Sequence, residues 1–75
     1  MMEEKITQIL TKINPLAAGG ERLVDDGVLD SLDIVSLVTA LNDAFGVSIP
    51  AVEILPDNFN SVEAMVRMIE RLDDV

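Results

Sequence analysis

Apolar residues recur at the three- and four-residue spacing of amphipathic helices in three ranges of the chain, 2–13, 31–45 and 61–72. Pro15 ends the first range, because proline disfavours helical geometry in the residue before it, and Gly46 ends the second. The positions predicted to face the core are Ile6, Ile9, Leu10 and Ile13, then Ile34, Leu37, Val38, Leu41 and Phe45, then Val62, Met65, Val66, Ile69 and Leu72. The pattern predicts one all-α domain spanning all 75 residues, with three main helices.

Two connections separate these helices. Residues 14–30 are long for so small a domain, and their apolar side chains predict a loop that packs on the core. The expected anchors are Leu16, Leu23, Val24, Val28 and Leu29. Residues 47–59 are expected to be irregular, with one short helical turn over 51–55. Asn60 is expected to cap the last helix, with Glu63 three residues later completing a capping box.

The start of the second helix carries the sequence Asp30-Ser31-Leu32-Asp33. Either Asp30 or Ser31 is the N-cap, and Asp33 stands where it would form a capping box with Asp30. The hydroxyl of Ser31 therefore lies at the positive end of the helix dipole, where backbone N–H groups favour an added phosphate. Taken alone, the four residues indicate no more than a capped helix start.

Five residues of this helix project away from its predicted core side at 100° per residue. They are Leu32, Val35, Ser36, Thr39 and Asp43. Two of the five are aliphatic and are predicted to meet water. Scattered exposed apolar side chains are normal in soluble proteins, which is one interpretation. The other is a face beside Ser31 that docks partner proteins.

Charge is distributed unevenly along the chain, whose formal net charge is −9. Residues 1–22 contain three acidic and three basic residues, whereas residues 23–66 contain eight acidic residues and no lysine or arginine. These acids keep a small protein soluble, or they steer it toward basic partner enzymes. Nucleic acid and anionic membrane surfaces are disfavoured as partners, because binding to phosphate groups needs clustered lysine and arginine.

The chain offers little for catalysis, since it contains neither histidine nor cysteine. The usual pairs of nucleophile and base are therefore absent, as are disulfides and thiolate metal sites. No apolar run approaches the roughly 20 residues that span a bilayer, and the N-terminus does not resemble a secretory signal. We expect a cytoplasmic, monomeric, non-catalytic protein without a metal site.

The order of these features resembles the acyl and peptidyl carrier protein family. The resemblance covers nearly the whole chain and is strongest over residues 29–50, which contain the motif and the run Phe45-Gly46-Val47-Ser48-Ile49-Pro50. It implies an antiparallel four-helix bundle with a long first loop and a short third helix. It also implies that a phosphopantetheinyl transferase attaches 4′-phosphopantetheine from coenzyme A to Ser31, and that the arm's thiol holds an acyl or aminoacyl group as a thioester. The positions expected to contact acyl- or aminoacyl-handling partner enzymes, through basic docking surfaces on those enzymes, are Asp30, Leu32, Asp33, Val35, Ser36 and Thr39.

The resemblance leaves the cargo open. Carriers of fatty acid synthesis are typically rich in glutamate along the second helix, where this chain has Ser36, Asn42 and Ala44. Residues 27–31 are similar to stand-alone D-alanyl carrier proteins, which serve the cell envelope, whereas Leu32-Asp33 is more similar to acyl carriers. A general acyl carrier and an aminoacyl or D-alanyl carrier remain close alternatives. Two other functional classes are also possible interpretations of the sequence. One is an acidic interaction module that carries no modification, and the other is an enzyme.

Overall fold

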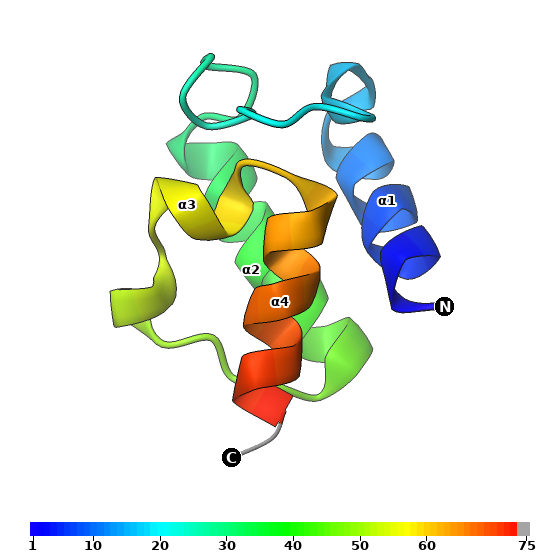
Figure 1. Cartoon of the computed structure of the whole chain (residues 1–75), viewed down its shortest axis with the longest axis vertical. Helices are drawn as coiled ribbons and strands as arrows, with labels where there is room; N and C mark the ends of the chain where they lie inside the picture. The colour runs from blue at the N-terminus through cyan, green and yellow to red at the C-terminus, as the bar shows by residue number, and fades with distance from the viewer. Residues whose placement is uncertain (74–75) are drawn as a thin grey trace.

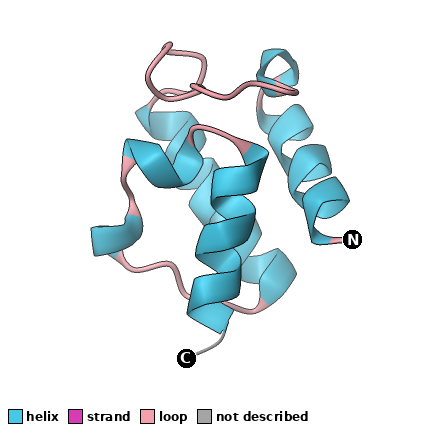
Figure 2. Cartoon of the chain, viewed as in Figure 1, coloured by secondary structure: helices cyan, strands magenta, loops and turns pink. Residues whose placement is uncertain are grey.

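Four α-helices and two 3₁₀ turns make up the computed structural model, which describes residues 1–73 (Figure 1). The elements are α1 (Met2–Ile13), η1 (Pro15–Ala17), α2 (Ser31–Phe45), η2 (Ala51–Glu53), α3 (Pro56–Phe59) and α4 (Val62–Asp73). No strand occurs among these 73 residues (Figure 2). The predicted all-α fold class is confirmed, and α1 and α2 have the predicted bounds.

The helices pack with α1 against both α2 and α4, while α3 packs on α4. Figure 1 shows that α1 runs opposite in direction to α2 and α4, and that the loop after η1 crosses one end of the bundle to reach α2. Figure 1 also shows that the chain leaves the far end of α2 and passes through η2 and α3 back toward the end of the bundle that the long loop crosses. The start of α2 therefore lies at the end of the bundle that the long loop crosses.

The core collects side chains from all four helices, from the long loop and from the connection after α2. Its buried members are Ile6, Leu10, Ala17, Leu23, Leu29, Leu37, Leu41, Ile49, Phe59, Met65, Met68 and Ile69. The other apolar positions predicted for α1, α2 and α4 are partly buried against this cluster. Leu16 was expected to anchor the loop, and this is wrong because its side chain is 85% exposed. The η1 turn after Pro15 instead directs Ala17 inward, where it is fully buried.

The predicted cap of the last helix is also wrong. The Ser61 hydroxyl oxygen accepts a hydrogen bond from the Ala64 backbone N–H at 3.0 Å, the bond that an N-cap makes. Asn60 has right-handed helical geometry at the end of α3 (φ −70°, ψ −23°), whereas an N-cap residue is usually extended. Its side chain is therefore available to the loop. Glu63, the expected partner of that cap, is exposed.

The connection between α2 and α4 is more regular than predicted. The expected turn over 51–55 is shorter, because η2 ends at Glu53. A separate four-residue helix, α3, then begins at Pro56. Proline suits the first helical position, since the N–H that it lacks would have no partner within the helix. The short third helix that the family resemblance implied is therefore present.

Two asparagines shape the long loop, Asn14 by joining its two ends and Asn60 by holding it to the segment between α3 and α4. The Asn14 side-chain amide donates to the Val28 carbonyl at 2.8 Å. The Asn60 side-chain oxygen accepts from the backbone N–H groups of Val24 and Asp25 at 2.9 and 3.1 Å, and its backbone carbonyl accepts from Leu23. Its amide donates to the Asp25 carboxylate at 3.2 Å. These bonds position the loop before it delivers the chain to the start of α2.

Candidate functional site

The first turn of α2 is closed by a reciprocal capping box. The Asp30 carboxylate accepts from the Asp33 backbone N–H at 2.9 Å, and the Asp33 carboxylate accepts from the Asp30 N–H at 3.3 Å. Asp30 has extended geometry and is therefore the N-cap, which decides between the two predicted candidates. Ser31 is left as the first helical residue.

Ser31 is exposed, and its hydroxyl makes no hydrogen bond among the residues that the structure describes. Because Asp30 does the capping, this hydroxyl is available for chemistry. It stands at the N-terminus of a 15-residue helix, where the dipole and the first N–H groups favour an anion. The two neighbouring carboxylates oppose that effect, so a phosphodiester on Ser31 would be stabilised by backbone groups rather than by side-chain charge.

An apolar groove of about 380 Å³ lies beside Ser31. Ser31, Ile34, Val35, Val38 and Thr39 line it from α2, and Ile54 lines it from the segment between η2 and α3. Its volume is within the range of small-molecule sites. Sequence reasoning placed Ile34 and Val38 in the core, and both are partly buried there while also lining the groove. Ile54 was missed, because nothing in the local pattern relates it to a residue of α2.

The predicted outer face of α2 is exposed around this groove. Leu32 and Val35 are 77% and 62% exposed, as expected for positions off the core stripe. Ser36 and Thr39 are also exposed, and Asp33 is half-buried in the capping box. The structure therefore places all of the residues predicted to contact partners along one helix beside Ser31. Val52, Ile54 and Leu55 add exposed apolar side chains from the segment that follows α2.

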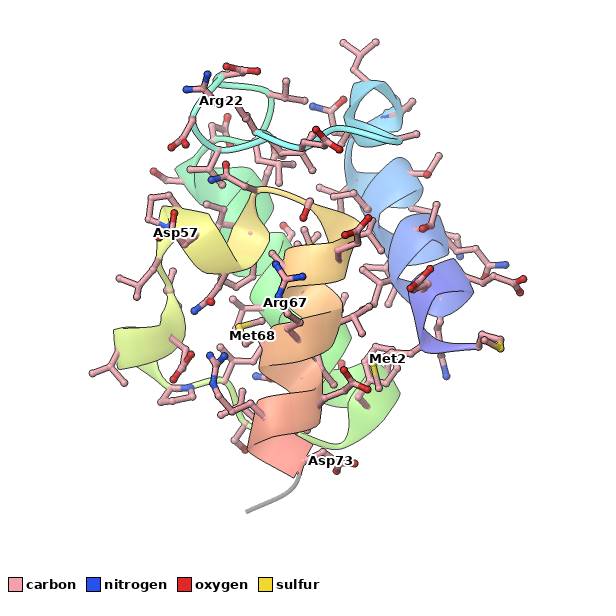
Figure 3. The ribbon with its side chains drawn as sticks, in the orientation of Figure 1. Met2, Arg22, Asp57, Arg67, Met68 and Asp73 are labelled. Atoms are coloured by element: carbon pink, nitrogen blue, oxygen red, sulfur yellow. The ribbon has the colours of Figure 1, made fainter. Side chains whose placement is uncertain are left out.

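The acids near Ser31 form no ion pair in the described part of the chain. The described residues form two ion pairs, Arg22 with Asp26 at 3.9 Å and Arg71 with Glu53. Neither involves Asp30 or Asp33, which therefore leave the start of α2 negative, and neither involves Asp43 near the other end of this helix or Asp57 on α3. Arg22 lies on the long loop and Asp57 on α3 (Figure 3).

Residues 1–73 contain neither a candidate membrane span nor a candidate metal site. None of the helices there has the length and hydropathy needed to cross a bilayer. Those residues also contain no cluster of three or more histidine, cysteine, aspartate or glutamate side chains able to hold a metal ion.

Comparison with known proteins identifies the family to which the chain belongs. Residues 5–69 match the family model described as "Phosphopantetheine attachment site". Aminoacyl carrier protein 1 of Bradyrhizobium diazoefficiens is 40% identical over 68 residues, which cover 87% of this chain and 74% of that protein. The D-alanyl carrier proteins of Streptococcus pyogenes serotypes M5 and M1 are 40% identical over 52 residues, which cover 69% of this chain and 66% of each relative.

The family and the relatives agree with one another. The relatives are carrier proteins by name, and the family model describes the attachment of phosphopantetheine. Members of such a family interact with a phosphopantetheinyl transferase and with enzymes that handle acyl or aminoacyl groups. The chain therefore belongs to the phosphopantetheine-dependent carrier proteins, and its covalent cofactor is 4′-phosphopantetheine.

Proposed function

We propose that Ser31 carries the phosphopantetheine arm and that the arm's thiol holds an aminoacyl group as a thioester. In the attachment step, the Ser31 oxygen attacks the pyrophosphate of coenzyme A at the phosphorus that bears the pantetheine. A phosphodiester forms, 3′,5′-adenosine bisphosphate leaves, and the hydroxyl proton passes to a base of the transferase. The observation that carries the assignment is the exposed hydroxyl of Ser31, left unused by the capping box of Asp30 and Asp33.

The chain contributes position rather than catalysis in this proposal. It has no cysteine of its own, so the thiol that bonds to the cargo comes from the arm. Partner enzymes activate the cargo and transfer it. We propose that the chain is a non-catalytic substrate of those enzymes. Three further properties remain predictions: that the chain is a single domain, that it is monomeric and that it is cytoplasmic.

The aminoacyl class is supported by the relatives, whose names specify aminoacyl and D-alanyl cargo. The test is to incubate the arm-bearing chain with ATP, one amino acid at a time and an amino-acid-adenylating enzyme from an aminoacyl or D-alanyl carrier system. Intact mass should show one aminoacyl addition that hydroxylamine removes, as expected for a thioester. Failure with every amino acid and adenylating enzyme, together with efficient loading by an acyl-activating enzyme, would contradict the aminoacyl assignment.

A general acyl carrier is the second candidate, and the apolar groove beside Ser31 favours it. Ile34, Val35, Val38 and Ile54 would offer a cargo chain or the lower part of the arm an apolar surface. The two candidates differ in the cargo that the groove must shelter. Retention of the thioester should depend on chain length for an acyl carrier, whereas an aminoacyl group such as D-alanyl would extend little into the groove.

Charge introduced on the outer face of α2 should impair loading. If this face makes an apolar contact, Leu32→Asp or Val35→Glu buries an unpaired carboxylate against the partner enzyme. The few residues that dominate an interface each contribute about 2 kcal/mol or more to the binding free energy. We therefore expect the rate of cargo loading to fall by about tenfold or more in each variant. Because both side chains are largely exposed, helical circular dichroism should be unchanged.

Leu16→Asp is the matched control for these two variants. Leu16 is a leucine on η1 that is 85% exposed, and it lies outside the groove and outside the predicted docking face. It should load at the wild-type rate. Equal impairment of Leu16→Asp would mean that loading responds to total charge, and loss of helicity in Leu32→Asp would mean that this face belongs to the core.

Screening salt should stabilise the protein without its arm. Only two ion pairs compensate the acids in the described residues, and the acids near Ser31 repel one another. Sodium chloride up to about 0.3 M should raise Tm, by about 4–8 °C for each kcal/mol of repulsion relieved in a domain of this size. A zwitterionic osmolyte, which screens charge weakly, is the control and should raise Tm less. A flat or falling Tm with sodium chloride would show that the acids are already compensated in the fold.

A further inference from the structure

The segment that supplies one wall of the Ser31 groove contains no buried side chain of its own. Residues 50–58, here called the strap, connect two core side chains, Ile49 and Phe59, which are 8% and 0% exposed. No side chain between these two is buried. The strap contains η2 and all of α3 except its last residue, Phe59, and Figure 1 shows it bulging away from α2 and α4 before it returns to the bundle.

The hydrogen bonds within the strap are almost all local. Backbone N–H groups of Glu53, Ile54, Leu55 and Asn58 donate to carbonyls two or three residues earlier. The Asn58 side-chain amide donates to the Glu53 carbonyl at 2.7 Å and to the Glu53 carboxylate at 3.1 Å. These bonds give the strap internal shape, but they do not fix it against the rest of the bundle.

One polar contact joins the strap to a main helix. The Arg71 guanidinium of α4 donates to the same Glu53 carboxylate oxygen that accepts from Asn58. Among the described residues, it is the only hydrogen bond or ion pair between the strap and α1, α2 or α4. The Glu53 side chain is 24% exposed and that of Arg71 53% exposed, so this contact is partly open to solvent.

The next residue after Glu53 is Ile54, the only residue of the strap that lines the groove. Ile54 is itself 41% exposed, so packing alone holds it weakly. We propose that Arg71, through Glu53, is a positioning residue that holds Ile54 over the groove and so sets how well an apolar cargo on Ser31 is sheltered from water. This inference rests on the proposed attachment of the arm to Ser31, and its apolar cargo is that of the second candidate, a general acyl carrier.

Two variants remove the contact in different ways. Arg71→Gln removes the cation, and Glu53→Gln removes the anion while keeping an oxygen that can accept from Asn58. Arg67→Gln is the matched control, because Arg67 is an exposed arginine one turn earlier on α4 and forms no ion pair among the described residues (Figure 3). Each changes the net charge by one unit, downward in the two arginine variants and upward in Glu53→Gln.

The first measurement uses the protein without its arm, and it does not depend on the proposed function. Methyl NMR would follow the cross-peaks from Ile54 to Val35 and Val38 across the groove. These cross-peaks should weaken in Arg71→Gln and Glu53→Gln but not in Arg67→Gln. Wild-type protein should lose intensity in the same peaks as sodium chloride is added, because salt screens partly exposed ion pairs. Unchanged cross-peaks in both contact variants would overturn the proposal.

The second measurement uses chains loaded with octanoyl- or acetyl-phosphopantetheine from the corresponding coenzyme A thioester. Partly exposed ion pairs contribute up to about 1 kcal/mol, so octanoyl thioester hydrolysis should be about two- to fivefold faster in the two contact variants. Acetyl thioester hydrolysis should be unchanged, because the acetyl group is too short to need the groove. Equal acceleration of both thioesters, or of Arg67→Gln, would overturn the proposal. If mass analysis shows no arm on Ser31, the proposed function fails, and the NMR result alone then decides whether Arg71 positions Ile54.

Discussion

Ser31→Ala should abolish addition of the phosphopantetheine arm while leaving the fold intact. The Ser31 side chain is exposed, and Asp30 rather than Ser31 caps α2, so loss of the hydroxyl removes no hydrogen bond that the structure records. Helical circular dichroism and Tm should match those of the wild type. Intact mass after treatment with a broad-specificity transferase and coenzyme A should show no added arm, and cargo loading should be undetectable.

The control for this variant is Ser48→Ala. Ser48 is an exposed serine beyond the end of α2, outside the groove and outside the predicted docking face. It should accept one arm at the wild-type rate. An arm that persists in Ser31→Ala would exclude Ser31 as the attachment site. A Ser31→Ala chain that fails to fold would contradict the finding that Asp30 alone supplies the cap.

Asn60→Ala should produce the largest loss of stability among the single polar substitutions considered. Asn60 is 9% exposed and makes three side-chain hydrogen bonds to Val24 and Asp25. Truncation leaves two backbone N–H groups and one carboxylate without this partner, and an unsatisfied group costs about 1–3 kcal/mol where it stays buried. Because the loop can admit some water, we expect the free energy of unfolding to fall by about 2–4 kcal/mol in a urea titration.

A graded comparison separates this effect from the general cost of losing an asparagine. The Asn42 side chain accepts one hydrogen bond, from the Ile49 N–H at 3.0 Å. Asn42→Ala should therefore lower the free energy of unfolding by about 1 kcal/mol. Equal losses in the two variants would mean that the Asn60 bonds do not hold the loop, and that apolar packing of Leu23 and Leu29 is sufficient.

The parts of the fold that depend on local patterns could be predicted from the sequence. The bounds of α1 and α2 follow from apolar periodicity and from stop signals one or two residues beyond each helix, Pro15 and Gly46. Gly46 has φ 64°, the left-handed geometry that glycine adopts at little cost. The capping box of Asp30 and Asp33 follows from their three-residue spacing. These features alone place Ser31 at an exposed helix start.

The parts that depend on distant residues could not be predicted. Asn60 contacts residues 35 and 36 positions earlier, and Arg71 contacts Glu53 across 18 positions. Spacing along one helix contains no information about either contact. The mistaken cap at Asn60 has the same origin, since asparagine favours both helix caps and loop contacts and only the tertiary fold decides between them. The groove was missed for a similar reason, because Ile54 faces α2 only after the strap has folded.

Attachment of the arm to Ser31 is tested most directly by mapping it on the unaltered protein. After reaction with coenzyme A and a broad-specificity transferase, the protein would be digested and its peptides fragmented by mass spectrometry. We predict one phosphopantetheine group per chain, localised to the Ser31 oxygen at the start of α2. An arm found on Ser36, Ser48 or Ser61, or a chain that stays unmodified with a transferase shown to be active on another carrier, would contradict the proposed attachment site.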